Sequence, residues 1–306
     1  REHQVRPHAC AGCLMACGRL ATIQKGRRKG LVIEGPEYET IYAFGGLCMI
    51  EEIEEIAYLN DLRDRMGMDT ITAGNLCAFT IEAVRRGKVR YEIDYGQPDQ
   101  IARLLVQIAN REGIGDVLAE GIAHAARQWD LEDLAVHVKG MEPAGYDPRT
   151  LKGMGLAYGT SDRGACHLRT TFYKPELAGL IPRDAVEGKA RMLIDYEDRL
   201  TIFDTLILCR FYRDLYPWEE LEKVVGMVTG LPSSREDLGK IASNIADMTR
   251  RFNLREGLDP EQDRLPRRLH REALPTGQAL TAGEMETMLR DYYRIRGWSE
   301  DGVPRD

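Results

Sequence analysis

Residues 8–18 read HACAGCLMACG and place Cys10, Cys13 and Cys17 at C-x2-C-x3-C spacing. A tight, glycine-containing turn can bring three such thiols to one metal centre. Thiolates are the ligands of iron–sulfur clusters and of structural zinc. The stretch therefore predicts a metal centre near the start of the chain, and we favour an iron–sulfur cluster.

Two other interpretations of these cysteines stay open. They could be three unrelated buried thiols, or three ligands of a zinc site completed by His3 or His8. A cluster needs a fourth ligand from elsewhere in the chain, and the candidates are the remaining cysteines, Cys48, Cys77, Cys166 and Cys209.

The rest of the chain has mostly helical patterns. Apolar residues recur at helical spacing in residues 99–111, 116–125, 233–252 and 281–292. The expected capping residues are Asp116 for the second stretch, Ser233 with Glu236 for the third and Thr281 with Glu284 for the fourth. We expect all four to face a core. Only residues 31–34 and 135–139 have the alternation of short strands. The patterns predict a mainly α protein with two helical domains, residues 1–138 and 139–306, joined near the Gly/Pro-rich stretch 139–149.

Composition limits the class of protein. The chain has 306 residues, of which 43% are hydrophobic and 30% charged, the balance of a globular protein. It has no run of about 18 apolar residues, which argues against a membrane span. The net charge of −7 argues against nucleic acid as the main partner. The odd count of seven cysteines and the lack of an apolar signal region favour a cytoplasmic protein.

Four further motifs are rich in groups that do chemistry. They read GPEYET from Gly35, DRMGMDT from Asp64, YDPR from Tyr146 and RGACHLR from Arg163. The last has a histidine beside a cysteine and between two arginines, which suggests a site for an anionic or phosphorylated ligand.

The ordered set of motifs resembles the aldehyde:ferredoxin oxidoreductase family of tungsten–pterin enzymes, over nearly the whole chain. The resemblance implies that Cys10, Cys13 and Cys17 are ligands of a [4Fe–4S] cluster. It also implies that Cys209 is the fourth ligand. Cys209 ends the stretch DTLILC, residues 204–209, which matches the family motif D-x2-G-L-C. Ile207 stands where the family has glycine.

The same resemblance implies two pterin-binding loops. In the family, D-x2-G-L-D and D-x2-G-L-C loops accept hydrogen bonds from the pterin rings. Here the first loop holds Asp64, Gly67 and Asp69, and the second holds Asp204 and Leu208. Arg169 matches a cationic residue that contacts pterin phosphate, a role that suits the guanidinium fork.

Catalysis is implied for two side chains. Glu39, with Glu37 as the alternative, matches the active-site glutamate, and His167 matches the active-site histidine. The expected reaction is oxidation of an aldehyde to a carboxylic acid at a tungsten or molybdenum bis-pterin. His167 would polarise the carbonyl oxygen, Glu39 would take the proton, and electrons would pass through the cluster to ferredoxin.

The family also has an N-terminal β-rich base domain, which we expect to be absent from this chain. On that expectation these are the second and third domains of a larger enzyme, inactive alone. A homodimer is a further expectation. The alternatives are a cluster-only electron-transfer module, a zinc-stabilised helical interaction protein, and a reductase of aromatic rings on coenzyme A thioesters. The basic run KGRRK at residues 25–29 could dock an acidic ferredoxin.

Overall fold

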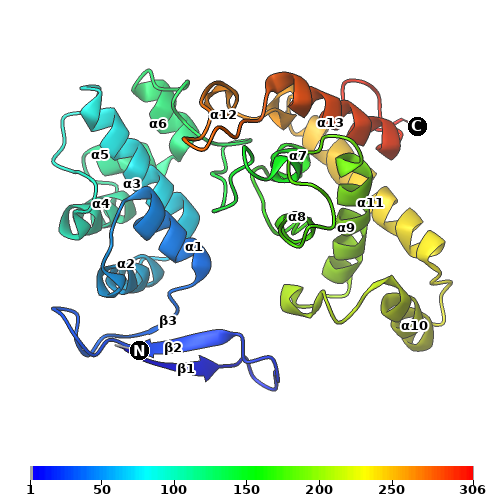
Figure 1. Ribbon diagram of the computed structural model, residues 1–306, viewed down its shortest axis with the longest axis horizontal. Helices are drawn as coiled ribbons and strands as arrows, with labels where there is room; N and C mark the ends of the chain where they lie inside the picture. Colours follow the sequence, from blue (N-terminus) through cyan, green and yellow to red (C-terminus); the bar gives the residue numbers. More distant parts are fainter. Residues whose placement is uncertain (1–2, 306) are drawn as a thin grey trace. The chain divides into compact units, whose positions relative to one another are not determined.

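The structure is a computed structural model that describes residues 3–305 (Figure 1). The chain forms two compact units, the first ending at Gly145 and the second beginning at Tyr146. This division falls inside the Gly/Pro-rich stretch 139–149. Each unit is described by itself.

The first unit opens with a small antiparallel sheet. Strands β1 (Gln4–His8) and β2 (Gly18–Thr22) form a hairpin, with His8 opposite Gly18, and β3 (Val32–Glu34) pairs with β2. The alternation in residues 31–34 predicted β3, whereas no pattern in the sequence predicted the hairpin. The expected strand at 135–139 is wrong, because this segment makes only an isolated bridge between Val138 and Met141.

Helices make up the rest of the first unit. They are α1 (Tyr38–Thr40), the π-helix η1 (Ile41–Leu47), α2 (Ile53–Arg65), α3 (Thr70–Arg85), α4 (Pro98–Asn110), α5 (Ile114–Ala119) and α6 (Ile122–Gln128). Their apolar faces form one core, in which Phe44, Leu59, Leu76 and Leu104 are almost fully buried. Helix α4 matches the predicted helix 99–111, but Asp116 lies inside α5 rather than capping it, and Gly121 separates α5 from α6.

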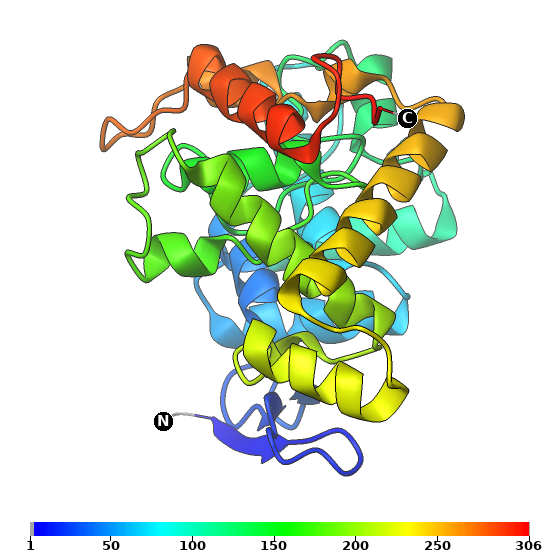
Figure 2. The ribbon, with the colours of Figure 1, turned by 90° about the vertical axis from the view of Figure 1, so that its right-hand side faces the viewer.

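In the described part of the second unit, the regular elements are all helices, joined by loops. It contains α7 (Lys152–Thr160), α8 (Tyr173–Leu177), α9 (Lys189–Thr205), η2 (Arg210–Tyr212), α10 (Trp218–Thr229), α11 (Arg235–Arg255), η3 (Pro260–Asp263), α12 (Arg267–Arg271) and α13 (Ala282–Arg296). Helix α9 packs against α11 and α13, and α7 packs against α9 and α13 (Figure 2). Helix α9 is therefore the element around which this unit is assembled.

Two predicted helices of the second unit differ in outcome. Helix α13 begins with the expected capping box of Thr281 and Glu284, and its stripe from Met285 to Tyr292 is buried. Helix α11 has its capping box one residue later than predicted, at Ser234 and Asp237. Its stripe is only partly core-facing. Leu238 is buried, whereas Met248 and Phe252 are 66% and 53% exposed.

Over the described residues, no helix is both long enough and apolar enough to cross a membrane.

Candidate functional site

The three N-terminal cysteines lie on the loop that joins β1 to β2. Cys10 is exposed and Cys13 and Cys17 are half-buried. The Cys13 amide donates to the Cys10 carbonyl across 3.0 Å, which closes a tight turn. The Arg19 guanidinium donates to the carbonyls of residues 16, 17 and 18, at 3.0, 3.2 and 2.8 Å, and fixes the end of the loop. The loop thus offers three accessible thiols on a backbone held by hydrogen bonds.

The histidines of the zinc interpretation have protein partners. His3 Nδ1 accepts from the Gln24 amide at 3.2 Å, and His8 Nδ1 lies 3.2 Å from Glu34 Oε1. Within residues 3–305, no three His, Cys, Asp or Glu side chains stand together in a metal-binding arrangement. The loop therefore has the right donor chemistry for a cluster, but its thiols are not gathered around one point.

The other four cysteines divide by exposure. Cys48, Cys77 and Cys166 are buried, and burial raises the pKa of Cys48 to about 12. A buried neutral thiol is a poor metal ligand. Cys209 is exposed and lies in the second unit. Exposure thus favours Cys209 among the candidate fourth ligands.

The first predicted pterin loop is the turn between α2 and α3. Gly67 follows the helix in the left-handed conformation, with φ of 69°. The Met68 amide donates back to the Arg63 carbonyl at 2.9 Å, which is the Schellman arrangement. Asp69 then caps α3, its Oδ1 accepting from the Thr72 amide at 2.9 Å. Asp64 is exposed, and Arg63 donates to it at 2.8 Å.

The second predicted pterin loop, after α9, repeats this geometry. Ile207 stands at the position of Gly67 and is also left-handed, with φ of 56°. The Leu208 amide donates to the Phe203 carbonyl at 2.9 Å. Ile207 is 92% exposed, so its side chain meets no packed neighbours there. The turn forms without the family's glycine.

Glu39 and Glu37 have different surroundings. Glu39 lies in α1, is half-buried, and its Oε2 accepts from the Gly145 amide at 2.9 Å. Burial raises the pKa of Glu39, and the charge of Asp69 raises it further. Glu37 is exposed at the start of the same helix. Partial burial and the hydrogen bond from Gly145 thus favour Glu39 over Glu37 as the candidate proton acceptor.

His167 lies among aromatic rings in the second unit. Its ring centroid is 5.8 Å from that of Tyr146 and 6.5 Å from that of Tyr173. The two tyrosine rings stack at 4.0 Å. His167 is half-buried, and its backbone carbonyl accepts a hydrogen bond from the Thr171 amide at 3.2 Å. The loop thus presents the histidine beside a flat apolar wall.

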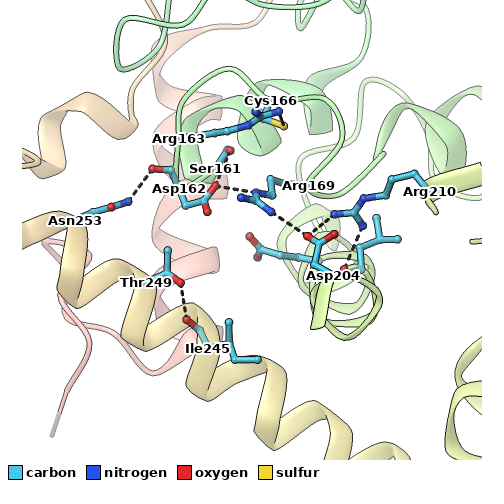
Figure 3. Close-up of polar contacts among 12 residues, drawn as sticks. Ser161, Asp162, Arg163, Cys166, Arg169, Asp204, Arg210, Ile245, Thr249 and Asn253 are labelled. Atoms are coloured by element: carbon cyan, nitrogen blue, oxygen red, sulfur yellow. Dashed lines mark hydrogen bonds and ion pairs between the residues drawn. The ribbon is translucent and has the colours of Figure 1, made fainter. Parts of the chain in front are cut away.

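Arg169 and Asp204, predicted from distant stretches, are in direct contact (Figure 3). Arg169 Nη1 donates to Asp204 Oδ2 at 2.9 Å, and its Nε donates to Asp162 Oδ1 at 2.9 Å. Arg210 donates to the same Asp204 oxygen at 2.7 Å. No sequence motif identified Asp162 or Arg210, although Asp162 directly precedes the RGACHLR stretch and Arg210 directly follows Cys209.

These ion pairs border a cavity of about 330 Å³ between α9 and α11. The hydroxyls of Thr160, Thr205 and Thr249 line it and donate to backbone carbonyls of their own helices. The Asn253 amide donates to the Asp162 carbonyl. Arg169 and Arg250 also line the cavity, which therefore combines carboxylate oxygens with guanidinium donors.

The basic run at residues 25–29 is partly neutralised by internal ion pairs. Arg27 donates to both oxygens of Glu55 at 2.6 and 2.9 Å and to Asp99 at 2.7 Å. Arg28 also contacts Glu55 and lies over the Tyr58 ring. Two of its four cations thus hold the β2–β3 loop on α2 and α4.

The comparisons with known proteins define the family. The family model of aldehyde ferredoxin oxidoreductase domains 2 and 3 matches residues 1–306. The chain therefore belongs to the aldehyde ferredoxin oxidoreductase family and corresponds to those two domains, as the sequence motifs predicted.

Curated relatives agree. The tungsten-containing aldehyde ferredoxin oxidoreductases of Pyrococcus furiosus and Thermococcus kodakarensis are each 33% identical, covering 100% of this chain and 52% of the relative. The WOR-like subunit of an aliphatic sulfonate oxidoreductase of Pyrococcus furiosus is 27% identical, covering 96% of this chain and 48% of that protein. The chain thus spans about half the length of the curated relatives it matches.

A solved structure shares the fold. The active-site complex BamBC of benzoyl coenzyme A reductase, with bound 1,5-dienoyl-CoA, matches with a TM-score of 0.76 and 19% identity. The match covers 98% of this chain and 51% of that chain.

Proposed function

We propose that the chain is the cofactor-holding and cluster-holding part of a tungsten–pterin oxidoreductase that oxidises aldehydes to carboxylic acids. The observation that carries the proposal is the pair of matching turns after α2 and α9. Each places the first aspartate of the motif near the end of a helix and the last residue of the motif, Asp69 or Cys209, two residues beyond a left-handed residue. Two equivalent loops suit a cofactor built from two equivalent pterins.

The polar groups of both loops fit a pterin ring. Asp64, Asp69 and Asp204 are exposed carboxylates, which accept hydrogen bonds and donate none when ionised. Arg169 keeps further N–H groups beyond its two carboxylate contacts, so a phosphate contact by this residue is part of the proposal.

The cysteines complete the electron route in this proposal. Cys10, Cys13 and Cys17 would hold a [4Fe–4S] cluster together with Cys209. Apolar side chains stand exposed beside both cysteine elements, with Leu14 at 98% and Ile207 at 92%. A cluster is stabilised when such groups exclude water from it. Electrons would leave through the cluster to ferredoxin.

Glu39 and His167 are the proposed catalytic side chains. The bound metal centre would take up the two electrons of the oxidation. His167 would donate a hydrogen bond to the carbonyl oxygen of the aldehyde and so hold the substrate. Glu39, whose pKa burial raises, would accept a proton as the acid product forms. The stacked tyrosines beside His167 would exclude water from that side.

Cofactor content tests the proposal before any substrate is known. The complete protein, purified from cells supplied with tungstate, should contain tungsten and pterin and should reduce a dye when given aldehydes. We expect the 306-residue chain by itself to hold no tungstopterin and to be inactive. A complete protein with iron and sulfide but no pterin would instead support a cluster-only electron carrier, and zinc without sulfide would support the zinc interpretation.

A further inference from the structure

Glu142 is a buried acid that none of the sequence motifs identified. The residue is only 3% exposed. Its Oε2 accepts from the Thr72 hydroxyl at 2.9 Å. Its Oε1 is buried and has no hydrogen-bond partner among the described residues. Buried polar atoms are nearly always hydrogen-bonded, so an unpartnered carboxyl oxygen calls for an explanation.

The segment that carries Glu142 is linked by hydrogen bonds to two acidic residues of the proposed site in the first unit, Asp69 and Glu39. Thr72, which holds Glu142, also donates its amide to Asp69. Gly145, three residues after Glu142, donates its amide to Glu39 at 2.9 Å. Hydrogen bonds thereby link the carboxyl groups of Glu39, Asp69 and Glu142 to neighbouring segments of this unit.

The three carboxyl groups differ in their burial. Burial raises the pKa of Glu142, and the charge of Asp69 raises it further. Glu39 responds to the same two causes. Asp69 is exposed and caps the N-terminus of α3. Burial favours the protonated form of Glu142, which can donate a hydrogen bond as well as accept one.

We propose that Glu142 is a further cofactor-binding residue, whose Oε1 forms a hydrogen bond with the pterin held by the loop from Asp64 to Asp69. The inference rests on the proposed function. One edge of a pterin ring carries N–H donors beside carbonyl and ring-nitrogen acceptors. An ionised carboxylate can serve only the donors, whereas a protonated one can also serve an acceptor.

Glutamine and leucine at position 142 separate this role from a purely structural one. Glu142→Gln keeps a donor and an acceptor, and Glu142→Leu removes both at similar volume. The measurements are pterin released per chain, followed by its fluorescence after oxidation, tungsten per chain, and the melting temperature of the cofactor-free protein. All are made on the complete protein.

We expect Glu142→Gln to keep its pterin within about twofold of the wild type. Glu142→Leu should lose about tenfold or more, because the ring's polar atom is then left unpaired. The melting temperature of cofactor-free Glu142→Leu should stay level or rise, since the substitution removes an unpartnered buried oxygen.

Thr72→Val is the matched control. It keeps Oε1 but removes the hydroxyl that holds Oε2, so pterin content should fall clearly less than in Glu142→Leu. Full pterin content in Glu142→Leu overturns the inference. So do parallel losses of pterin and melting temperature in Glu142→Leu and Thr72→Val, which would show a structural role. A wild-type protein that holds no pterin overturns the proposed function and this inference with it. The pterin content of the wild type alone therefore tells failure of the proposed function from failure of this inference.

Discussion

Gly67 and Ile207 occupy the same position in two turns that have the same hydrogen bonds, one in each unit. Both residues are left-handed, with φ of 69° and 56°. Glycine adopts this conformation freely, whereas a β-branched residue with an L configuration is strained there. The second turn therefore carries a local cost that the first does not.

Replacing Ile207 with glycine should stabilise the protein. The strain is relieved and no buried contact is lost, because Ile207 is 92% exposed. Allowing for the greater freedom of glycine in the unfolded chain, we expect a gain of about 0.5–1 kcal/mol in the free energy of unfolding. Urea denaturation measures it. Gly67→Ile is the matched control and should lose at least as much; no change in either variant would contradict the strain argument.

The cysteine assignment predicts a difference between Cys209 and Cys166. If Cys209 is the fourth ligand, Cys209→Ser should lower bound iron and acid-labile sulfide well below the roughly four of each expected for a [4Fe–4S] cluster. Cys166 is buried against Arg163, which donates to its sulfur at 2.9 Å. Cys166→Ser should therefore keep its iron. The reverse pattern of iron loss would reject the assignment.

Lys189 and Glu176 form a fully buried ion pair in the second unit. Removing only the cation leaves the carboxylate without its counter-charge, although the Gly153 amide still donates to it at 2.9 Å. Lys189→Met should cost about 3–5 kcal/mol of unfolding free energy. The double variant Lys189→Met/Glu176→Leu should recover most of that loss. A double variant as unstable as the single one would show that the pair contributes through packing instead.

The stability of the second unit should decrease with pH through Asp198. Burial raises the pKa of Asp198 to about 6, even though Arg296 donates to it at 2.7 Å. An acid whose pKa is higher in the folded state contributes stability that is complete below its unfolded pKa of about 3.9 and is lost as the pH rises through the folded value. Wild-type stability should therefore fall by up to about 3 kcal/mol between pH 4 and 7 relative to Asp198→Asn. Parallel pH profiles for the two proteins would contradict this shift.

Local patterns predicted those helices whose apolar stripe is buried. The 281–292 pattern matches α13 because its capping box and its stripe agree with one packed face. The 233–252 pattern gave a helix but not its surroundings, since Met248 and Phe252 are exposed. The hairpin of β1 and β2 was missed because Pro7, Gly18 and the cysteine-rich loop lack strand alternation, and pairing between the strands forms it.

In the candidate site, too, the sequence motifs identified some residues and not others. The family motifs identified Arg169 and Asp204, which the structure brings together although they lie 35 residues apart. They did not identify Arg210, which shares Asp204, or Glu142, whose significance comes from burial and an unpartnered oxygen. Those properties depend on tertiary packing, which no local pattern reports.

The repeated turn forms whatever side chain its last residue, Asp69 or Cys209, carries. Backbone hydrogen bonds and one left-handed residue define the turn, so the side chain that ends it is not needed to form it. In one copy that side chain is an aspartate that caps the next helix, and in the other it is an exposed cysteine. The same backbone turn therefore tolerates either residue at its last position. A change of one residue can exchange a hydrogen-bonding carboxylate for a redox-active thiol while the turn keeps its conformation.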